Sequence, residues 1–321
     1  MRIAPLAVAA VALMAATAIS VRAGIEDQAA GDQQSAGAQP STEVYQALPS
    51  KPESYLGLYA PQMPGSYSSV TSFTQMTGVA PDVVMYYSSW LEHFRTDFAQ
   101  TAARHGAVPL IQMEPAGISL AAIAAGAYDS YLASYAQSVR AYGDAVILSF
   151  GHEMNGSWYS WGYRHASAAD FVKAWRHVVM VFRKVGADNV TWLWTANIVS
   201  AQPGNSEIPS PGAWWPGGSY VTWVGIDGYY IQPSWRFVSL FGPTIAIIRK
   251  FTGEPILISE TGAAQAGQTT QIADLAAGVH TYGLLGFVWF DAKGKLDWSI
   301  RSPAAIAALR DAASAYPGQS A

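Results

Sequence analysis

The chain has 321 residues, half of them hydrophobic (50%), and a formal net charge of −4. This length allows two domains, but a single barrel of about 250 residues fits equally well. The charge and the lack of Lys/Arg clusters interleaved with aromatics argue against nucleic-acid binding. The absence of cysteine excludes disulfides, a thiolate nucleophile and zinc ribbons.

The N-terminus is typical of an exported protein. Arg2 precedes an apolar stretch from Ile3 to Val21, and Val21-Arg22-Ala23 places small residues where a signal peptidase cuts. Residues 1–23 are therefore predicted to be a signal peptide, with an uncleaved membrane anchor as the alternative. Residues 24–53 lack hydrophobic periodicity and are predicted to form a flexible linker. We expect a secreted monomer with no obligate protein partner.

Short apolar runs alternate with longer amphipathic segments across residues 54–316. Eight runs are candidate strands: Tyr55–Tyr59, Asp82–Tyr87, Val108–Met113, Ala145–Phe150, Val190–Trp194, Val221–Ile226, Pro255–Ser259 and Leu284–Phe290. Four segments are candidate helices: Phe94–His105, Ala166–Val185, Thr269–Tyr282 and Pro303–Ala315. Ser167, three residues before Asp170, has the spacing of a helix cap, and Gly186 suits the end of the same helix.

This alternation favours an α/β fold, a (β/α)8 TIM barrel with a single catalytic domain at residues 54–316. A doubly wound open sheet is the competing architecture. It would need a glycine-rich phosphate-binding turn after the first strand, and residues 60–65 do not form one.

Catalytic residues of such a barrel follow the C-terminal ends of its strands. Polar and aromatic residues occupy those positions here: Trp90, Glu114, His152, Glu153, Asn197, Asp227, Tyr229, Glu260 and Asp291. Glu153 and Glu260 each end a buried run, and a pair of carboxyl groups is what cleavage of a glycosidic bond requires. A zinc protease is excluded because Gly156 stands where its second histidine would be, and no Gly-x-Ser-x-Gly esterase motif occurs.

Several segments resemble glycoside hydrolase family 26, the β-mannanase family. The family's acid/base motif is resembled by the segment Gly151-His152-Glu153-Met154-Asn155-Gly156-Ser157-Trp158-Tyr159-Ser160-Trp161. Less specific matches to other motifs of the family lie at residues 224–229, 258–262, 288–290 and 297–300. The resemblance runs from about Tyr55 to Ile300. Ser160 and Asp291 depart from the pattern, where many relatives have Pro and Asn, and these departures leave the sugar open.

The resemblance implies a retaining mechanism with Glu153 as acid/base, Glu260 as nucleophile and Tyr229 hydrogen-bonded to Glu260. It also places Trp158 and Trp289 along the cleft. The other candidate sugar contacts are His152, Asn155, Glu114, Trp90 and Trp161. Asp227 is a candidate to support the nucleophile and its partner Tyr229 without contacting the sugar. Neither a metal nor an organic cofactor is expected.

We therefore expect a secreted retaining endo-β-glycosidase that hydrolyses β-1,4-mannan or glucomannan. Two alternatives stay open at this point. The same scaffold can act on mixed-linkage β-glucan or β-xylan, or the barrel can bind polysaccharide without cleaving it.

Overall fold

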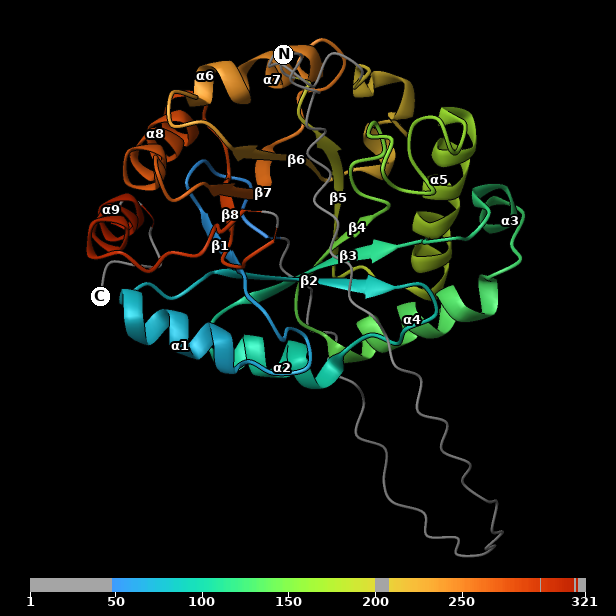
Figure 1. Cartoon of the computed structure of the whole chain (residues 1–321). Coiled ribbons are helices and arrows are strands. Elements are labelled where there is room, and N and C mark those ends of the chain that lie inside the picture. Colours follow the sequence, from blue (N-terminus) through green and yellow to red (C-terminus); the bar gives the residue numbers. More distant parts are fainter. Residues whose placement is uncertain (1–47, 200–207, 295, 315, 317–321) are drawn as a thin grey trace, which may run out of the picture.

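A closed barrel of eight parallel strands, in sequence order, forms the centre of the molecule (Figure 1). The computed structural model describes residues 48–199, 208–294, 296–314 and 316. The predicted signal peptide and most of the predicted linker therefore lie outside the described residues. The strands are β1 (Tyr55–Tyr59), β2 (Val83–Ser89), β3 (Val108–Glu114), β4 (Val146–Phe150), β5 (Val190–Asn197), β6 (Trp223–Tyr230), β7 (Ile256–Ala263) and β8 (Gly286–Phe290). The predicted (β/α)8 architecture is confirmed.

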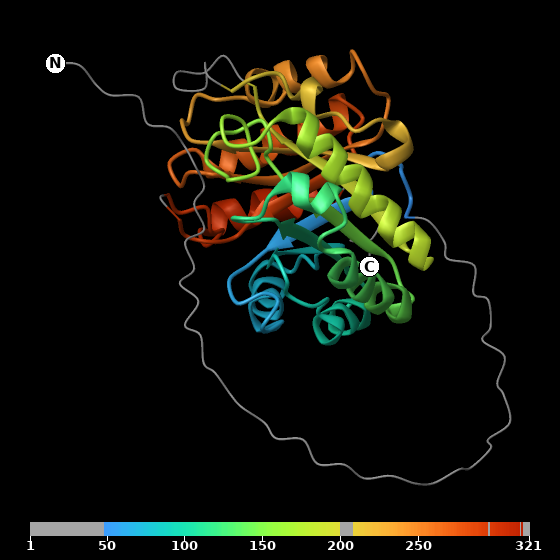
Figure 2. The same cartoon turned by 90° about the vertical axis from the view of Figure 1, so that its right-hand side faces the viewer.

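Helices surround the barrel as an outer layer (Figures 1 and 2). They are α1 (Ser68–Thr77), α2 (Thr96–Arg104), α3 (Leu120–Ala124), α4 (Asp129–Tyr142), α5 (Ala168–Val185), α6 (Phe237–Leu240), α7 (Gly242–Ile248), α8 (Gln268–Thr281) and α9 (Pro303–Ala313). In α5 the Ser167 hydroxyl accepts a bond from the Asp170 amide at 3.0 Å, and Gly186 ends the helix at φ 78°, as predicted. Within the described ranges, no helix is long and apolar enough to span a membrane.

Five strands extend further toward their C-terminal ends than the sequence predicted, β2 and β3 by one or two residues and β5, β6 and β7 by three or four. β5, β6 and β7 continue to Asn197, Tyr230 and Ala263, so the polar residues near their ends lie within the strands rather than after them. The apolar runs stop earlier because the side chains at this end of the barrel are polar, whereas the backbone ladder continues. That ladder pairs Asn197 with Asp227 and Asp227 with Glu260. Three polar residues on consecutive strands are thereby held at one level.

Small side chains fill the barrel interior below this level. A Cβ atom added to Gly225 would lie 2.4 Å from Thr195 Oγ1 and 2.5 Å from Ser259 Oγ. Ser149 donates a hydrogen bond to the same Thr195 oxygen at 3.1 Å. The interior is therefore a packed core rather than a channel, and it supports the polar residues above it.

Candidate active site

Glu153 is fixed from both sides directly after β4. Its backbone has φ 53°, an uncommon conformation for a residue other than glycine, and its N–H donates to the Thr195 carbonyl at 2.9 Å. Trp158 Nε1 donates to Oε2 and Asn197 Nδ2 donates to Oε1, each at 2.6 Å. Each oxygen keeps a second lone-pair position, so the carboxyl group can still carry a proton.

Glu260 lies within β7 and accepts hydrogen bonds from two phenols. The Tyr229 hydroxyl donates to Oε1, as the family resemblance predicted, and the Tyr87 hydroxyl donates to Oε2. Tyr87 was not among the predicted site residues. It ends the apolar run of β2, so the rule that catalytic groups lie at strand ends would have found it.

The two carboxyl groups differ in their electrostatic environment. Burial, together with the charge of Glu260, raises the pKa of Glu153 to about 8. Burial also raises the pKa of Glu260, but the hydrogen bonds from Tyr229 and Tyr87 lower it. Two carboxyl groups whose environments separate their titrations are suited to acid and nucleophile roles.

Asp227 is a third buried carboxyl group between these two. It accepts a hydrogen bond from Ser259 Oγ at 2.6 Å, and its Oδ2 has no partner among the described residues. Burial, and then the charges of Glu260 and Glu153, raise the pKa of Asp227 well above its usual range. Despite these acidic groups, no cluster of His, Asp and Glu side chains in the described ranges is arranged to hold a metal ion.

His152 is neutral in this site, because burial lowers its pKa to about 3. Its 3.9 Å approach to Glu114 is therefore not an ion pair. His152 Nε2 lies 3.1 Å from the Tyr159 hydroxyl, and Trp161 Nε1 donates to the His152 carbonyl at 2.8 Å. Burial, and then the Glu260 charge, raise the pKa of Glu114 to about 7. His152 is 1% exposed, so the predicted sugar contact is enclosed, and the partly exposed Glu114 is the group that this side of the site offers to a ligand.

The structure does not bring Trp289 to the carboxylates. Its side chain has 0% exposure, and its Nε1 donates to the Trp298 carbonyl at 3.0 Å. The next residue, Phe290, stacks on Tyr59 at 4.3 Å, and Tyr59 contacts Tyr87 at 5.4 Å. Successive strand residues point to opposite faces, so Phe290 faces the Glu260 side while Trp289 faces away from it.

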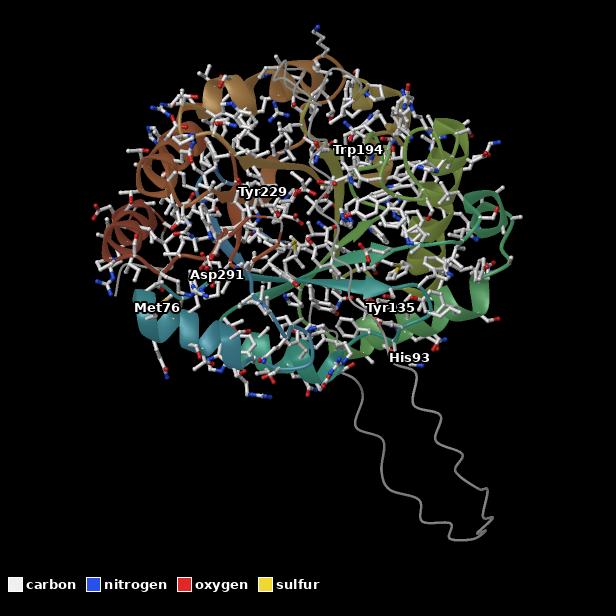
Figure 3. All side chains as sticks on the ribbon, in the orientation of Figure 1. Met76, His93, Tyr135, Trp194, Tyr229 and Asp291 are labelled. Atoms are coloured by element: carbon white, nitrogen blue, oxygen red, sulfur yellow. The ribbon has the colours of Figure 1, made fainter. Side chains whose placement is uncertain are left out.

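Three more predicted sugar contacts are enclosed. Asn155 exchanges two hydrogen bonds with the Asn197 backbone, at 2.9 and 2.8 Å. Trp161 is 1% exposed and stacks on Tyr159 with ring centroids 4.3 Å apart. Trp90 packs against Tyr128, Tyr131 and Phe150. In contrast, Trp158 is partly exposed beside Glu153. Tyr229 is buried at the barrel, inside the layer of helices (Figure 3).

Comparison with known proteins shows which family the chain resembles. The model of glycosyl hydrolase family 26 matches residues 121–254, a range that includes Glu153 and ends before Glu260. Endoglucanase H of Acetivibrio thermocellus is 30% identical over 265 residues, which make up 77% of this chain and 29% of that protein. Beta-1,3-xylanase TXYA of Vibrio sp. is 26% identical over 221 residues, 64% of this chain and 44% of that protein. The chain thus spans less than half the length of either relative.

A solved structure shares the same fold. The modular endo-beta-1,4-mannanase of Cellulomonas fimi superposes with a TM-score of 0.61, covering 83% of this chain and 71% of that one, at 16% identity. At this identity the likeness concerns the barrel rather than the substrate. The family model, the shared sequence and the barrel agree with the motifs of the chain. The predicted resemblance to glycoside hydrolase family 26 is thereby confirmed.

Proposed function

We propose that this protein hydrolyses a β-linked polysaccharide by double displacement, with Glu153 as acid/base and Glu260 as nucleophile. The observation that carries the proposal is the contrast between the two carboxyl groups. Glu153 retains a proton at neutral pH, since its pKa is raised to about 8. Glu260 receives two phenolic hydrogen bonds that favour its ionised form.

In the first step, a Glu260 oxygen attacks the anomeric carbon and forms an ester bond to the sugar. The bond from that carbon to the glycosidic oxygen breaks, and Glu153 gives its proton to the departing oxygen. In the second step, Glu153 takes a proton from water while the water oxygen attacks the same carbon. The ester bond to Glu260 breaks, and the sugar leaves with its original anomeric configuration.

The surrounding residues divide into two groups in this proposal. Trp158 is partly exposed and offers a sugar-stacking face while its N–H holds Glu153. Glu114, whose side chain is 22% exposed, presents a carboxyl group for sugar hydroxyls, whereas His152 is enclosed and its Nε2 contacts the Tyr159 hydroxyl. Asn155 supports Asn197, and Trp161 supports His152, because their polar atoms are already bonded within the protein.

For the substrate, β-glucan is our first candidate and β-1,4-mannan the second. The relative that is 30% identical is named an endoglucanase, which favours a glucan backbone. The motif at residues 151–161 resembles that of the β-mannanases and favours mannan. A glucoside and a mannoside differ in the orientation of the C2 hydroxyl, so a direct assay is required. We also propose that the enzyme cleaves within the polysaccharide chain, that it is exported from the cell and that it is a monomer.

The test is reducing-sugar release by the purified protein from mixed-linkage β-glucan, glucomannan, galactomannan and β-1,3-xylan in parallel. Glu260→Ala should abolish release. Glu254→Ala should not, because Glu254 lies just before β7 at the opposite end of that strand. Binding of these polymers without release, by the unchanged protein, would support a non-catalytic barrel and contradict the proposal.

Azide tests the two roles separately on an aryl β-glycoside. In Glu260→Ala, azide should replace the carboxylate and give the α-glycosyl azide by one inversion. In Glu153→Ala, azide should replace water in the second step and give the β-glycosyl azide. The opposite assignment of products would exchange the two roles, and an α-configured sugar released by the unchanged enzyme would exclude retention.

A further inference from the structure

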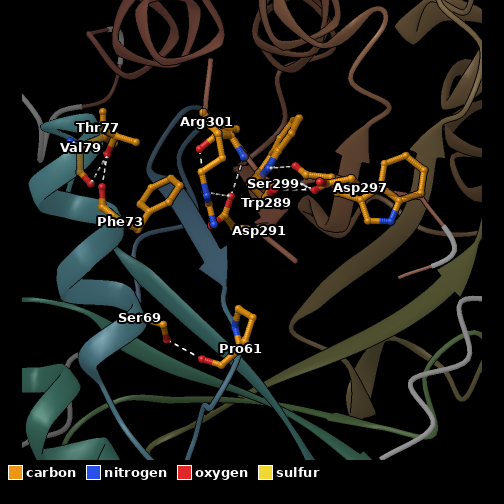
Figure 4. A network of polar contacts seen from close by, with 12 residues as sticks. Pro61, Ser69, Phe73, Thr77, Val79, Trp289, Asp291, Asp297, Ser299 and Arg301 are labelled. Atoms are coloured by element: carbon orange, nitrogen blue, oxygen red, sulfur yellow. Dashed lines mark hydrogen bonds and ion pairs between the residues drawn. The ribbon is translucent and has the colours of Figure 1, made fainter. Parts of the chain in front are cut away.

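A pocket lies outside the barrel interior, between α1 and the segments that follow β1 and β8. Its volume is about 350 Å³. Its polar lining includes Gln62, Ser69, Ser72 and Arg301, and Phe73 and Met76 supply apolar surface. We call it the α1 pocket. Figure 4 shows Phe73 on α1 and the pair Asp291 and Arg301 on the neighbouring segment.

The charged pair at this pocket is electrically balanced. Arg301 Nη1 donates to Asp291 Oδ1 at 3.0 Å and to Oδ2 at 2.9 Å, and the Ile300 amide donates to Oδ1 at 2.7 Å (Figure 4). The Asp291 side chain is 3% exposed, whereas that of Arg301 is 53% exposed. Within the described ranges, Arg301 Nε and Nη2 have no hydrogen-bond partner. These two nitrogens can therefore donate hydrogen bonds to a ligand. Because Asp291 neutralises the charge of Arg301, the pair has no net charge that would attract an anion.

The remaining lining is suited to a neutral polyhydroxylated ligand. The Ser69 hydroxyl donates to the Pro61 carbonyl and Gln62 Oε1 accepts from Ser68, so Ser69 offers an acceptor oxygen and Gln62 its NH2 group. Ser72 adds a hydroxyl, and the guanidinium N–H groups of Arg301 donate to hydroxyl oxygens. Phe73 and Met76 offer apolar surface for the C–H faces of a sugar ring. A volume of about 350 Å³ lies at the small end of the range for ligand pockets, which suits a monosaccharide or disaccharide unit.

The pocket is also connected with the catalytic side of the barrel. Asp291 directly follows Phe290, and Ala60 directly follows Tyr59, and the rings of Phe290 and Tyr59 are stacked. Tyr59 in turn contacts Tyr87, whose hydroxyl binds Glu260. The lining residues Ala60 and Asp291 are thus chain neighbours of rings that lie beside the surroundings of the nucleophile. Both sites lie at the C-terminal ends of the strands, where one polysaccharide chain can bind to both.

We propose that the α1 pocket is a second saccharide-binding site, which holds one or two units of a neutral polysaccharide outside the catalytic cleft. The ligand class rests in part on the proposed glycosidase function. Two linked sites raise the apparent affinity for a long chain without changing the chemistry at the first. The site should therefore affect polymers and not short substrates.

Ser72→Trp tests the proposal, because Ser72 is exposed and an indole there fills the pocket from α1. Gln75→Trp is the matched control, an equally exposed residue of α1 that does not line the pocket. Ser72→Trp should raise KM for the preferred polysaccharide roughly 100-fold, at the low end of the gain from linked sites. Its kcat, and its activity on an aryl β-glycoside, should match those of Gln75→Trp. Equal KM values in the two variants would refute the proposal.

A direct measurement does not depend on Ser72→Trp folding or on hydrolysis. Crystals of Glu260→Ala soaked with cellobiose or mannobiose should show the sugar in the α1 pocket, with hydrogen bonds to Arg301 and a pocket serine. An empty pocket, or one that takes up citrate or phosphate but neither disaccharide, would overturn the proposal. If the sugar binds there but the unchanged protein hydrolyses no polymer, the second site stands and the proposed activity falls.

Discussion

Removing either phenol from Glu260 should slow catalysis and shift its pH dependence. We consider Tyr87→Phe and Tyr229→Phe, which keep the ring and delete one hydrogen bond to a carboxylate oxygen. A hydrogen bond to a charged group contributes about 1.5–3 kcal/mol. If that energy stabilises the ionised nucleophile, its loss lowers kcat/KM by roughly 10- to 150-fold.

The direction of the pH shift follows from the same hydrogen bonds. Both phenols lower the pKa of Glu260 because they favour its charged form. Deleting one of them raises that pKa, by roughly 1 to 2 units for the same energy. Since the nucleophile must be ionised, the acidic limb of the kcat/KM profile should move to higher pH in each variant. The double variant should lose more than either single one, because the donors serve different oxygens.

The assay is kcat/KM on an aryl β-glycoside across the pH range in which the fold is stable. Tyr142→Phe is the control, since it deletes a phenolic bond to the Ala99 carbonyl, 3.1 Å long, on α4. It should leave both the rate and the acidic limb unchanged. If Tyr87→Phe and Tyr229→Phe behave like this control, the argument that phenols hold the nucleophile ionised is wrong.

Three further changes probe the acid and its support. Because burial raises the pKa of Glu153 to about 8, kcat/KM should fall above that pH, and Glu153→Gln should remove this limb and cost roughly 10²- to 10⁴-fold in rate; an unchanged alkaline limb would assign it to another group. Asn155→Ala removes the bonds that hold Asn197, so unfolding in urea should show a loss of about 1–3 kcal/mol, with a lower kcat; full kcat would show that Asn197 is held otherwise. Gly225→Ala would place a methyl group 2.4 Å from Thr195 Oγ1, so thermal unfolding should reveal a cost of about 1–3 kcal/mol, whereas an unchanged melting temperature would contradict the close packing.

The barrel could be predicted from sequence because its strands are continuous apolar runs. Strands buried on both faces have that pattern, and eight of them alternated with amphipathic segments. The ends of β5, β6 and β7 were missed because polar side chains take over at the catalytic end while backbone pairing continues. The sequence signal for a strand was lost where the site begins.

Glu153, Glu260 and Tyr229 could be assigned because each lies in a recognisable segment at a strand end. Tyr87 and Asn197 could not be assigned roles, although Tyr87 donates a hydrogen bond to Glu260 and Asn197 donates one to Glu153. Each makes its contact across the barrel wall or interior, from a strand other than β4 and β7, which position the two glutamates. Such contacts depend on the register between strands, which side-chain patterns within one strand do not specify.

The orientation of Trp289, away from the carboxylates, follows from the same property of strands. A one-residue difference in alignment moves a side chain to the opposite face, and the pairing of β7 with β8 shifts between Ile258 and Thr261. A matching Trp-Phe pair therefore does not determine which ring faces the carboxylates. Here Phe290 faces them, and an indole is supplied from the loop after β8, where Trp298 packs 4.7 Å from Tyr229. Because Trp289 Nε1 donates to the Trp298 carbonyl, the enclosed Trp289 indole anchors the loop that carries Trp298.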